Sequence, residues 1–161
     1  MLVSRTGTFN MFGGEITGNT AKRGGGVGVW ADGMFSMSGG TIYDNAGERG
    51  GGVYVASNGI FSMSGSAAIT GNTGSYGGVY VEGTFSMSGG TICGNYFTNG
   101  GAGMTIESGT VNMYGGEIRG NCVSVSAGAG VRIQEFGNFN MAGSAAIREN
   151  VSISPSGGGG V

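Results

Sequence analysis

Apolar and polar residues alternate with fixed spacing in six segments of this chain. Each segment opens with a glycine, places an apolar residue two positions later and a methionine two positions after that. The first column comprises Phe9, Phe35, Phe61, Phe85, Val111 and Phe139, and the second comprises Met11, Met37, Met63, Met87, Met113 and Met141. Because alternation with a period of two is typical of a strand with one buried face, each segment is expected to contain such a strand.

Each segment continues with an isoleucine and, three residues later, an asparagine. The isoleucines are Ile16, Ile42, Ile69, Ile92, Ile118 and Ile147, and the asparagines are Asn19, Asn45, Asn72, Asn95, Asn121 and Asn150. Successive asparagines are 26, 27, 23, 26 and 29 residues apart. Self-similarity with a period of this length indicates a protein built from stacked repeats.

A second apolar phrase, such as Val53-Tyr-Val55 or Val79-Tyr-Val81, lies between the segments and usually follows two or three glycines. It reads as another strand, and a third, shorter strand leads into each isoleucine. The distance from the asparagine to this phrase varies from seven to ten residues. Length variation therefore concentrates in one corner of the repeat, as in solenoids that carry loops on one side.

These patterns predict an all-β fold. We expect a right-handed parallel β-helix, or β-solenoid, of about six coils of roughly 26 residues, with three short strands per coil. Residues 1–161 should form a single solenoid segment that belongs to a longer repeat array. The apolar columns should stack from coil to coil, and the six asparagines should form a structural ladder because a side-chain amide both donates and accepts hydrogen bonds.

Composition agrees with this interpretation once the period is known. The 40 glycines in 161 residues would suggest a low-complexity chain without it. A net charge of −2 and a single lysine, Lys22, argue against nucleic-acid binding. The longest apolar runs are only a few residues, so no membrane span is expected, and no signal peptide is visible.

The two ends align with the interior of a coil. Met1 and Val3 match Val53 and Val55, and the chain ends at Val161 in the opening of a seventh coil. Neither end carries the polar cap that solenoids need. The expected partners are therefore flanking coils of a longer chain, or a second copy through end-to-end association.

The residues do not form a recognisable reaction centre. Without histidine, a Ser-His triad is excluded within this chain, and the two cysteines, Cys93 and Cys122, lie in different registers and favour neither a disulfide nor zinc. Glu82 and Glu107 follow adjacent valine strands and could hold a cation or raise a pKa, although two solvated glutamates are the simpler interpretation. We expect no catalytic residue, metal or cofactor.

The outward positions of the valine strands form the first candidate binding surface. Tyr54 and Tyr80 should stack, with Trp30 at the same edge and Arg132 further along. Aromatic faces on a rigid sheet can bind sugar rings or a protein, but they also stabilise sheets without any ligand. The variable corner after each asparagine, which includes Lys22 and Val125, is the second candidate surface.

Three phrases carry a resemblance to a known group of proteins: Gly-Gly-Val-Tyr-Val at 51–55, Phe-Ser-Met-Ser-Gly-Gly-Thr-Ile at 85–92 and Ile-Thr-Gly-Asn-Thr at 16–20 and 69–73. They resemble the repeats of bacterial cell-surface proteins, adhesin-like right-handed parallel β-helices in the style of polymorphic outer-membrane proteins. The resemblance covers all six coils and implies an extracellular or cell-surface stalk or adhesive domain.

The leading hypothesis is thus a non-enzymatic structural or adhesive β-solenoid of a bacterial cell-surface or secreted protein, which contacts a host surface or a polysaccharide. One alternative is a polysaccharide-binding or polysaccharide-active β-helix, which would need a groove lined by carboxylates and aromatic rings. Another is a self-assembling filament unit that adds coils through its uncapped ends. An ice-binding solenoid is disfavoured, because the column that begins Thr8, Met34, Ile60 is too mixed.

Overall fold

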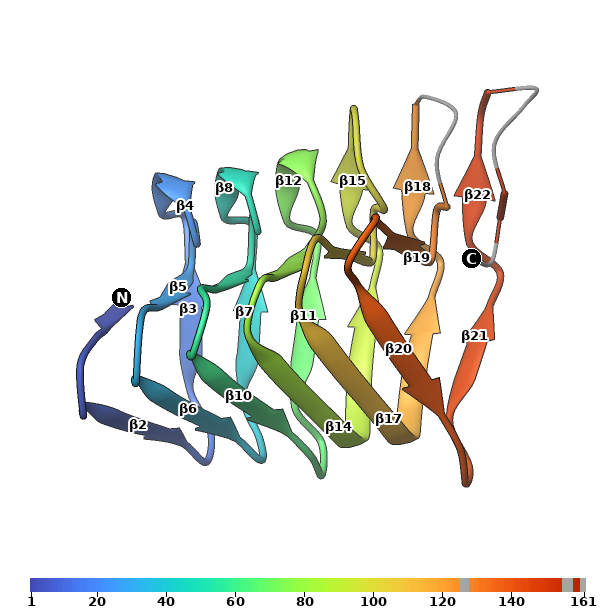
Figure 1. The fold of residues 1–161 in the computed structure, drawn as a ribbon. Coiled ribbons are helices and arrows are strands. Elements are labelled where there is room, and N and C mark those ends of the chain that lie inside the picture. The colour runs from blue at the N-terminus through green and yellow to red at the C-terminus, as the bar shows by residue number, and fades with distance from the viewer. Residues whose placement is uncertain (125–127, 155–157, 160–161) are drawn as a thin grey trace.

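The chain folds as a parallel β-solenoid of about six turns of roughly 26 residues, as seen in a computed structural model that describes residues 1–124, 128–154 and 158–159 (Figure 1). Strands from successive turns form three parallel sheets, and no helix occurs in these ranges. The all-β solenoid predicted from the repeat is confirmed. Val125 and Val161, which the sequence places in the variable corner and at the chain end, lie outside the described residues.

The first sheet contains the valine phrases, one per turn. Its strands are β1 (Leu2–Val3), β5 (Val27–Val29), β9 (Val53–Val55), β13 (Val79–Val81), β16 (Met104–Ile106) and β19 (Val131–Ile133). Each strand pairs in register with the next, so that Val53 lies opposite Val79 and Tyr54 opposite Tyr80.

The second sheet contains the Phe-x-Met strands and the strands around the isoleucines. The first set is β2 (Thr8–Met11), β6 (Met34–Met37), β10 (Ile60–Met63) and β20 (Asn138–Met141). The second set is β3 (Glu15–Thr17), β7 (Thr41–Tyr43), β11 (Ala68–Thr70) and β21 (Ala146–Arg148). In two turns the strands continue through the corner as β14 (Thr84–Cys93) and β17 (Thr110–Arg119), which joins both sets into one sheet.

The third sheet is formed by short arms that follow each asparagine. They are β4 (Thr20–Arg23), β8 (Ala46–Arg49), β12 (Thr73–Tyr76), β15 (Tyr96–Phe97), β18 (Cys122–Val123) and β22 (Val151–Ser152), the upper row in Figure 1. The arm adds a strand to each turn, because the corner predicted as a variable loop is itself a strand; four turns have four separate strands, and the turns with β14 and β17 have three. Apart from the pairs Arg23/Arg49 and Gly47/Gly74, its residues differ from one turn to the next, and no apolar pattern marks the first three arms.

The core consists of the predicted columns, each residue stacked on its counterpart in the next turn. The rings of Phe35, Phe61 and Phe85 are parallel, with centroids 4.8 and 4.6 Å apart, and all three are buried. The methionines and isoleucines of the middle turns are buried beside them. At the two ends of the stack, Phe9 and Phe139 are only half-buried, because each has a neighbouring turn on one side.

One glycine column makes room for the asparagines. A Cβ built on Gly52 would lie 2.7 Å from Cγ2 of Ile69 and 3.1 Å from Nδ2 of Asn72, and Gly26 and Gly103 meet the equivalent atoms of their own turns. These distances are shorter than van der Waals contact, so any side chain here would displace the amide. The glycine before each valine phrase is therefore a packing requirement.

Candidate functional site

The six asparagines form one continuous hydrogen-bonded ladder. The Asn45 amide nitrogen Nδ2 donates to Oδ1 of Asn72 at 3.1 Å, and the backbone N–H of Asn45 donates to the same oxygen at 3.0 Å. The same two bonds join every neighbouring pair from Asn19 to Asn150. Nδ2 also donates to the carbonyl of the preceding turn's isoleucine, 2.8 Å for Asn45 to Ile16. Four of these side chains are fully buried with their hydrogen bonds satisfied, so the ladder is structural.

The sequence predicts that Tyr54 and Tyr80 face outward beside Trp30. This prediction of exposure is wrong, because both tyrosines are buried. Tyr54 and Tyr80 have 1% and 2% of their surface accessible, and Trp30 is half-buried against them. Their rings do stack, with centroids 5.8 Å apart. The rings are covered by arginine side chains from the arms, which approach from strands β4 and β8.

Arg23 and Arg49 occupy the same position in successive arms. The guanidinium of Arg23 lies 5.6 Å from the Trp30 ring and 5.5 Å from the Tyr54 ring, and that of Arg49 lies 5.4 Å from the Tyr80 ring. These are cation–π distances. The third sheet is thereby fastened to the first across the aromatic rings, and Tyr54 and Tyr80 of the candidate binding surface belong to the interior.

The glutamates that follow the valine strands are bound to the same cluster. The Tyr54 hydroxyl donates to Oε2 of Glu82 at 2.6 Å, and Arg49 makes an ion pair with Glu82 at 3.3 Å. Tyr80 is hydrogen-bonded to Glu107, to which Gln134 also donates. Both carboxylates therefore anchor protein groups.

Burial and the glutamate partner change the acidity of the two tyrosines. Two effects raise the pKa of Tyr54 from 10.0 to about 12: burial of the phenol, which is the larger, and its hydrogen bond to Glu82. The pKa of Tyr80 is also raised, mainly by burial and then by the hydrogen bond to Glu107. A charged phenolate beside a carboxylate is disfavoured in both cases.

The tyrosine pKa shifts lead to an expected pH dependence. Because the folded protein holds the Tyr54 proton to higher pH than the unfolded chain does, this contribution to stability is complete below pH about 10 and is lost as the pH rises through about 12. A pH titration followed by tyrosinate absorbance should show tyrosines that ionise at unusually high pH in the folded protein. Once the protein has unfolded, the same tyrosines should ionise near their ordinary pKa. Tyr54→Phe should remove one late-ionising group, and an unchanged titration curve in this variant would contradict the assignment.

Arg132 lies apart from the aromatic cluster. It occupies the same column as Tyr80 but two turns further on, with Thr105 between them. Its Nη1 donates to the carbonyl of Asn99 at 2.7 Å. The four residues predicted as one surface therefore divide into a buried aromatic group and a separate arginine.

Other ionisable and thiol groups do not gather at a common centre. Arg148 and Arg119 both contact the carboxylate of Glu117, at 2.9 and 3.2 Å. Cys93 and Cys122 are free thiols, and the register pairs Cys93 with Arg119 and Cys122 with Tyr96. Within the described residues, no three His, Cys, Asp or Glu side chains are placed to share a metal ion.

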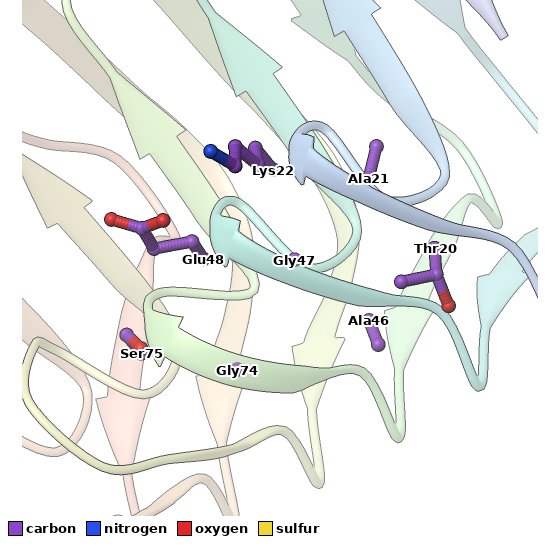
Figure 2. Close-up of a pocket in the computed structure, with 8 residues that line it drawn as sticks. All are labelled: Thr20, Ala21, Lys22, Ala46, Gly47, Glu48, Gly74 and Ser75. Atoms are coloured by element: carbon purple, nitrogen blue, oxygen red, sulfur yellow. The ribbon is translucent and has the colours of Figure 1, made fainter.

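A surface hollow crosses the first three arms and is the best remaining candidate site. It has a volume of about 580 Å³ and is lined by Thr20, Ala21, Lys22, Ala46, Gly47, Glu48, Gly74 and Ser75. Figure 2 shows Lys22 and Glu48 near the tips of β4 and β8, with Thr20 and Ala46 nearer their bases. We call this feature the arm hollow. Its lining combines two glycines with hydroxyl, ammonium and carboxylate groups.

Sequence reasoning pointed to the variable corner but not to the hollow. In the fourth arm the column of Gly47 and Gly74 is occupied by Phe97, which is fully buried with Val123, Ala102 and Ala129. The change from glycine to phenylalanine along this column is visible in the sequence only after the arm strands have been aligned. That alignment requires the backbone register.

Comparison of the chain with family models, with curated proteins and with solved structures gave no match. In the described part of the chain, no helix has the length and apolar character to cross a bilayer. The assignment of a role therefore rests on the repeat, the fold and the surfaces described above.

Proposed function

We propose that this chain is a non-enzymatic structural and adhesive β-solenoid segment of a bacterial cell-surface or secreted protein. The observation that carries the proposal is that the carboxylates bind other side chains of the same protein. The carboxylates of Glu82, Glu107 and Glu117 each bind arginine, tyrosine or glutamine side chains that fasten one layer or turn to another. The asparagine ladder and the aromatic cluster serve the same purpose. The extracellular location follows from the resemblance of the repeats to those of adhesin-like proteins.

The arm hollow is the proposed adhesive surface, with a polysaccharide as its ligand. Thr20 and Ser75 contribute hydroxyl groups to its lining, Lys22 contributes donors and Glu48 contributes acceptors. Sugar hydroxyls both donate and accept hydrogen bonds, so this mixture of donors and acceptors suits them. Flanking coils of a longer chain would extend the same row of arms.

The proposal is tested by binding of the whole 161-residue chain to a panel of neutral and acidic polysaccharides. Ala46→Tyr should cover the hollow without disturbing the sheet, because the same column carries the half-exposed Tyr96 in the fourth turn. Cys122→Tyr is the matched control, since it lies in that column outside the hollow.

We expect at least about tenfold weaker binding for Ala46→Tyr and unchanged binding for Cys122→Tyr, a loss of about 1.4 kcal/mol or more. Binding that is unaffected by Ala46→Tyr, or no binding to any polysaccharide, would reject the arm hollow as the adhesive surface. Release of new reducing ends from a bound polysaccharide would show that the chain is an enzyme.

A further inference from the structure

The tips of the first two arms carry a concentration of positive charge. Three of the chain's seven lysine and arginine residues lie there, Lys22 and Arg23 in β4 and Arg49 in β8. Together with Glu48 they line a second, smaller hollow of about 130 Å³, which we call the tip hollow. It shares Lys22 and Glu48 with the arm hollow, and Figure 2 shows both side chains extending beyond the tips of β4 and β8 on the same side. The two hollows are therefore neighbours along the arms.

Arg23 has hydrogen-bond donors that the protein does not use. Its guanidinium is placed over the rings of Trp30 and Tyr54, at 5.6 and 5.5 Å, and the residue is exposed. A ring contact offers no lone pair, so it does not replace a hydrogen-bond acceptor for the five N–H donors. Among the described residues, no carboxylate forms an ion pair with Arg23. The rings thus position a guanidinium, and less conformational entropy is lost when it binds an anion.

The charges around the tip hollow do not balance. Arg49 is paired with Glu82 at 3.3 Å, and this carboxylate also accepts the Tyr54 hydroxyl. Within the described part of the chain, Lys22 forms no ion pair with any carboxylate, Glu48 included. Lys22 and Arg23 therefore face a single carboxylate, that of Glu48. The hollow has an excess of positive charge on a chain whose net charge is −2.

Packing of the arms on the aromatic rings does not require this charge. In the third arm, Tyr76 occupies the position of Arg49. Its ring packs edge-on against Tyr80, with centroids 6.2 Å apart. An uncharged side chain thus covers the same tyrosine column, so the arginines of the first two arms supply something that packing alone does not need.

The tip hollow is formed between neighbouring arms and not by an end of the stack. Its four residues come from β4 and β8, which stand side by side in the row of arms in Figure 1. A ligand that lies across the arm hollow can therefore reach the tip hollow without leaving the row.

We propose that the ligand of the arm hollow is an acidic polysaccharide, and that the tip hollow binds its carboxylate or sulfate group. The oxyanion would accept two hydrogen bonds from the guanidinium of Arg23, whose planar fork matches a pair of oxygens, and one from the ammonium of Lys22. Hydroxyl groups of the same sugar chain would contact the arm hollow. This inference rests on the proposed function and deepens it by naming the class of polysaccharide.

Three forms of one polysaccharide test the inference: neutral dextran, carboxymethyl dextran and dextran sulfate, each titrated calorimetrically into the whole 161-residue chain. We expect at least one charged form to bind about tenfold more tightly than dextran, and the tighter of the two identifies the oxyanion. Charged forms that bind no more tightly than dextran would overturn the inference. The proposed function would still stand if a neutral polysaccharide of the panel bound and Ala46→Tyr weakened that binding.

Charge-neutralising variants place the oxyanion. Arg23→Gln should weaken binding of the charged form about tenfold, and Lys22→Gln about threefold, with a smaller loss for dextran in both cases. Because Arg23 also packs on aromatic rings, the exposed Lys22 supplies the variant that leaves packing intact. Arg5→Gln is the matched control: it changes the net charge equally, and Arg5 is exposed outside both hollows, so binding should not change.

Glu48→Gln should have the opposite effect. It removes the one carboxylate of the tip hollow but keeps a hydrogen-bond acceptor, so the charged form should bind about threefold more tightly. Circular dichroism confirms that each variant is folded. Unchanged binding by Lys22→Gln, or an equal loss in Arg5→Gln, would show that the oxyanion does not bind at the tip hollow.

Discussion

Replacement of Asn72 by alanine is expected to destabilise the chain by about 3–5 kcal/mol, because buried polar groups that lose their partners cost about 1–3 kcal/mol each. Asn72 is fully buried in the middle of the ladder. Its Oδ1 accepts the backbone N–H of Asn45, and its Nδ2 donates to the carbonyl of Ile42 at 3.0 Å. Alanine would leave both of these backbone groups unpaired away from water. Equilibrium unfolding in urea measures the loss.

Asn140→Ala is the matched control for this experiment. Asn140 also donates to an asparagine of the neighbouring turn, Oδ1 of Asn112 at 2.9 Å, but this pair is exposed on the outer face of the second sheet. Water replaces the lost partner there, so the free energy of unfolding should change by less than about 0.5 kcal/mol. If Asn72→Ala and Asn140→Ala had equal effects, the ladder would not be a main source of stability.

The second large effect is expected at Phe61. Truncation to alanine should cost about 3–5 kcal/mol, the usual range for a buried phenylalanine. Phe61 is fully buried between the parallel rings of Phe35 and Phe85, so the variant loses two ring contacts and leaves a cavity in the centre of the stack. Phe61→Asp should prevent the third turn from forming, because it would bury a charge without a partner.

The effect at Phe61 should spread to both neighbouring turns, since each turn of a solenoid is stabilised mainly by the next. Hydrogen exchange should show lost protection in strands β6 and β14 as well as in β10, which pairs with both. Phe12→Ala serves as the control, because this side chain is 80% exposed and the same truncation removes little buried surface. An alanine variant at Phe61 that unfolds like the parent would show that the phenylalanine column is not in the core.

The sequence was sufficient to predict the columns in which the same type of side chain recurs in every turn. Phe61 and Asn72 could be placed in columns because each stacks on a copy of itself, and the period of the columns is the period of the fold. The glycine before each valine phrase was also visible, although the reason for it was not. Only the structure shows that the Cβ of Gly52 would meet Asn72 and Ile69.

The arms and the site could not be predicted in the same way. Strands β4, β8 and β12 pair through their backbones, and most of their residues differ from turn to turn, so no apolar pattern marks them. Without the arms, Tyr54 appeared to face solvent. Arg23 and Arg49 occupy the same position in successive repeats. This recurrence could have indicated that arginine side chains lie over the tyrosine rings. The arm hollow follows the course of the backbone across three arms and is lined by residues that share no motif, so the sequence does not mark it.

The central claim is that successive turns stack in one register, and disulfide formation between introduced cysteines tests it most directly. In a background with Cys93→Ser and Cys122→Ser, cysteines are introduced at Ser36, Ser62 or Ser86, which are register neighbours on the outer face of the second sheet. Neighbouring parallel strands lie about 4.8 Å apart, within the Cα separation of about 4.4–6.8 Å that a disulfide spans. We expect the pairs 36/62 and 62/86 to oxidise readily and the pair 36/86, two turns apart, to remain reduced. Ready oxidation of 36/86, or failure of both adjacent pairs, would contradict the stacked register.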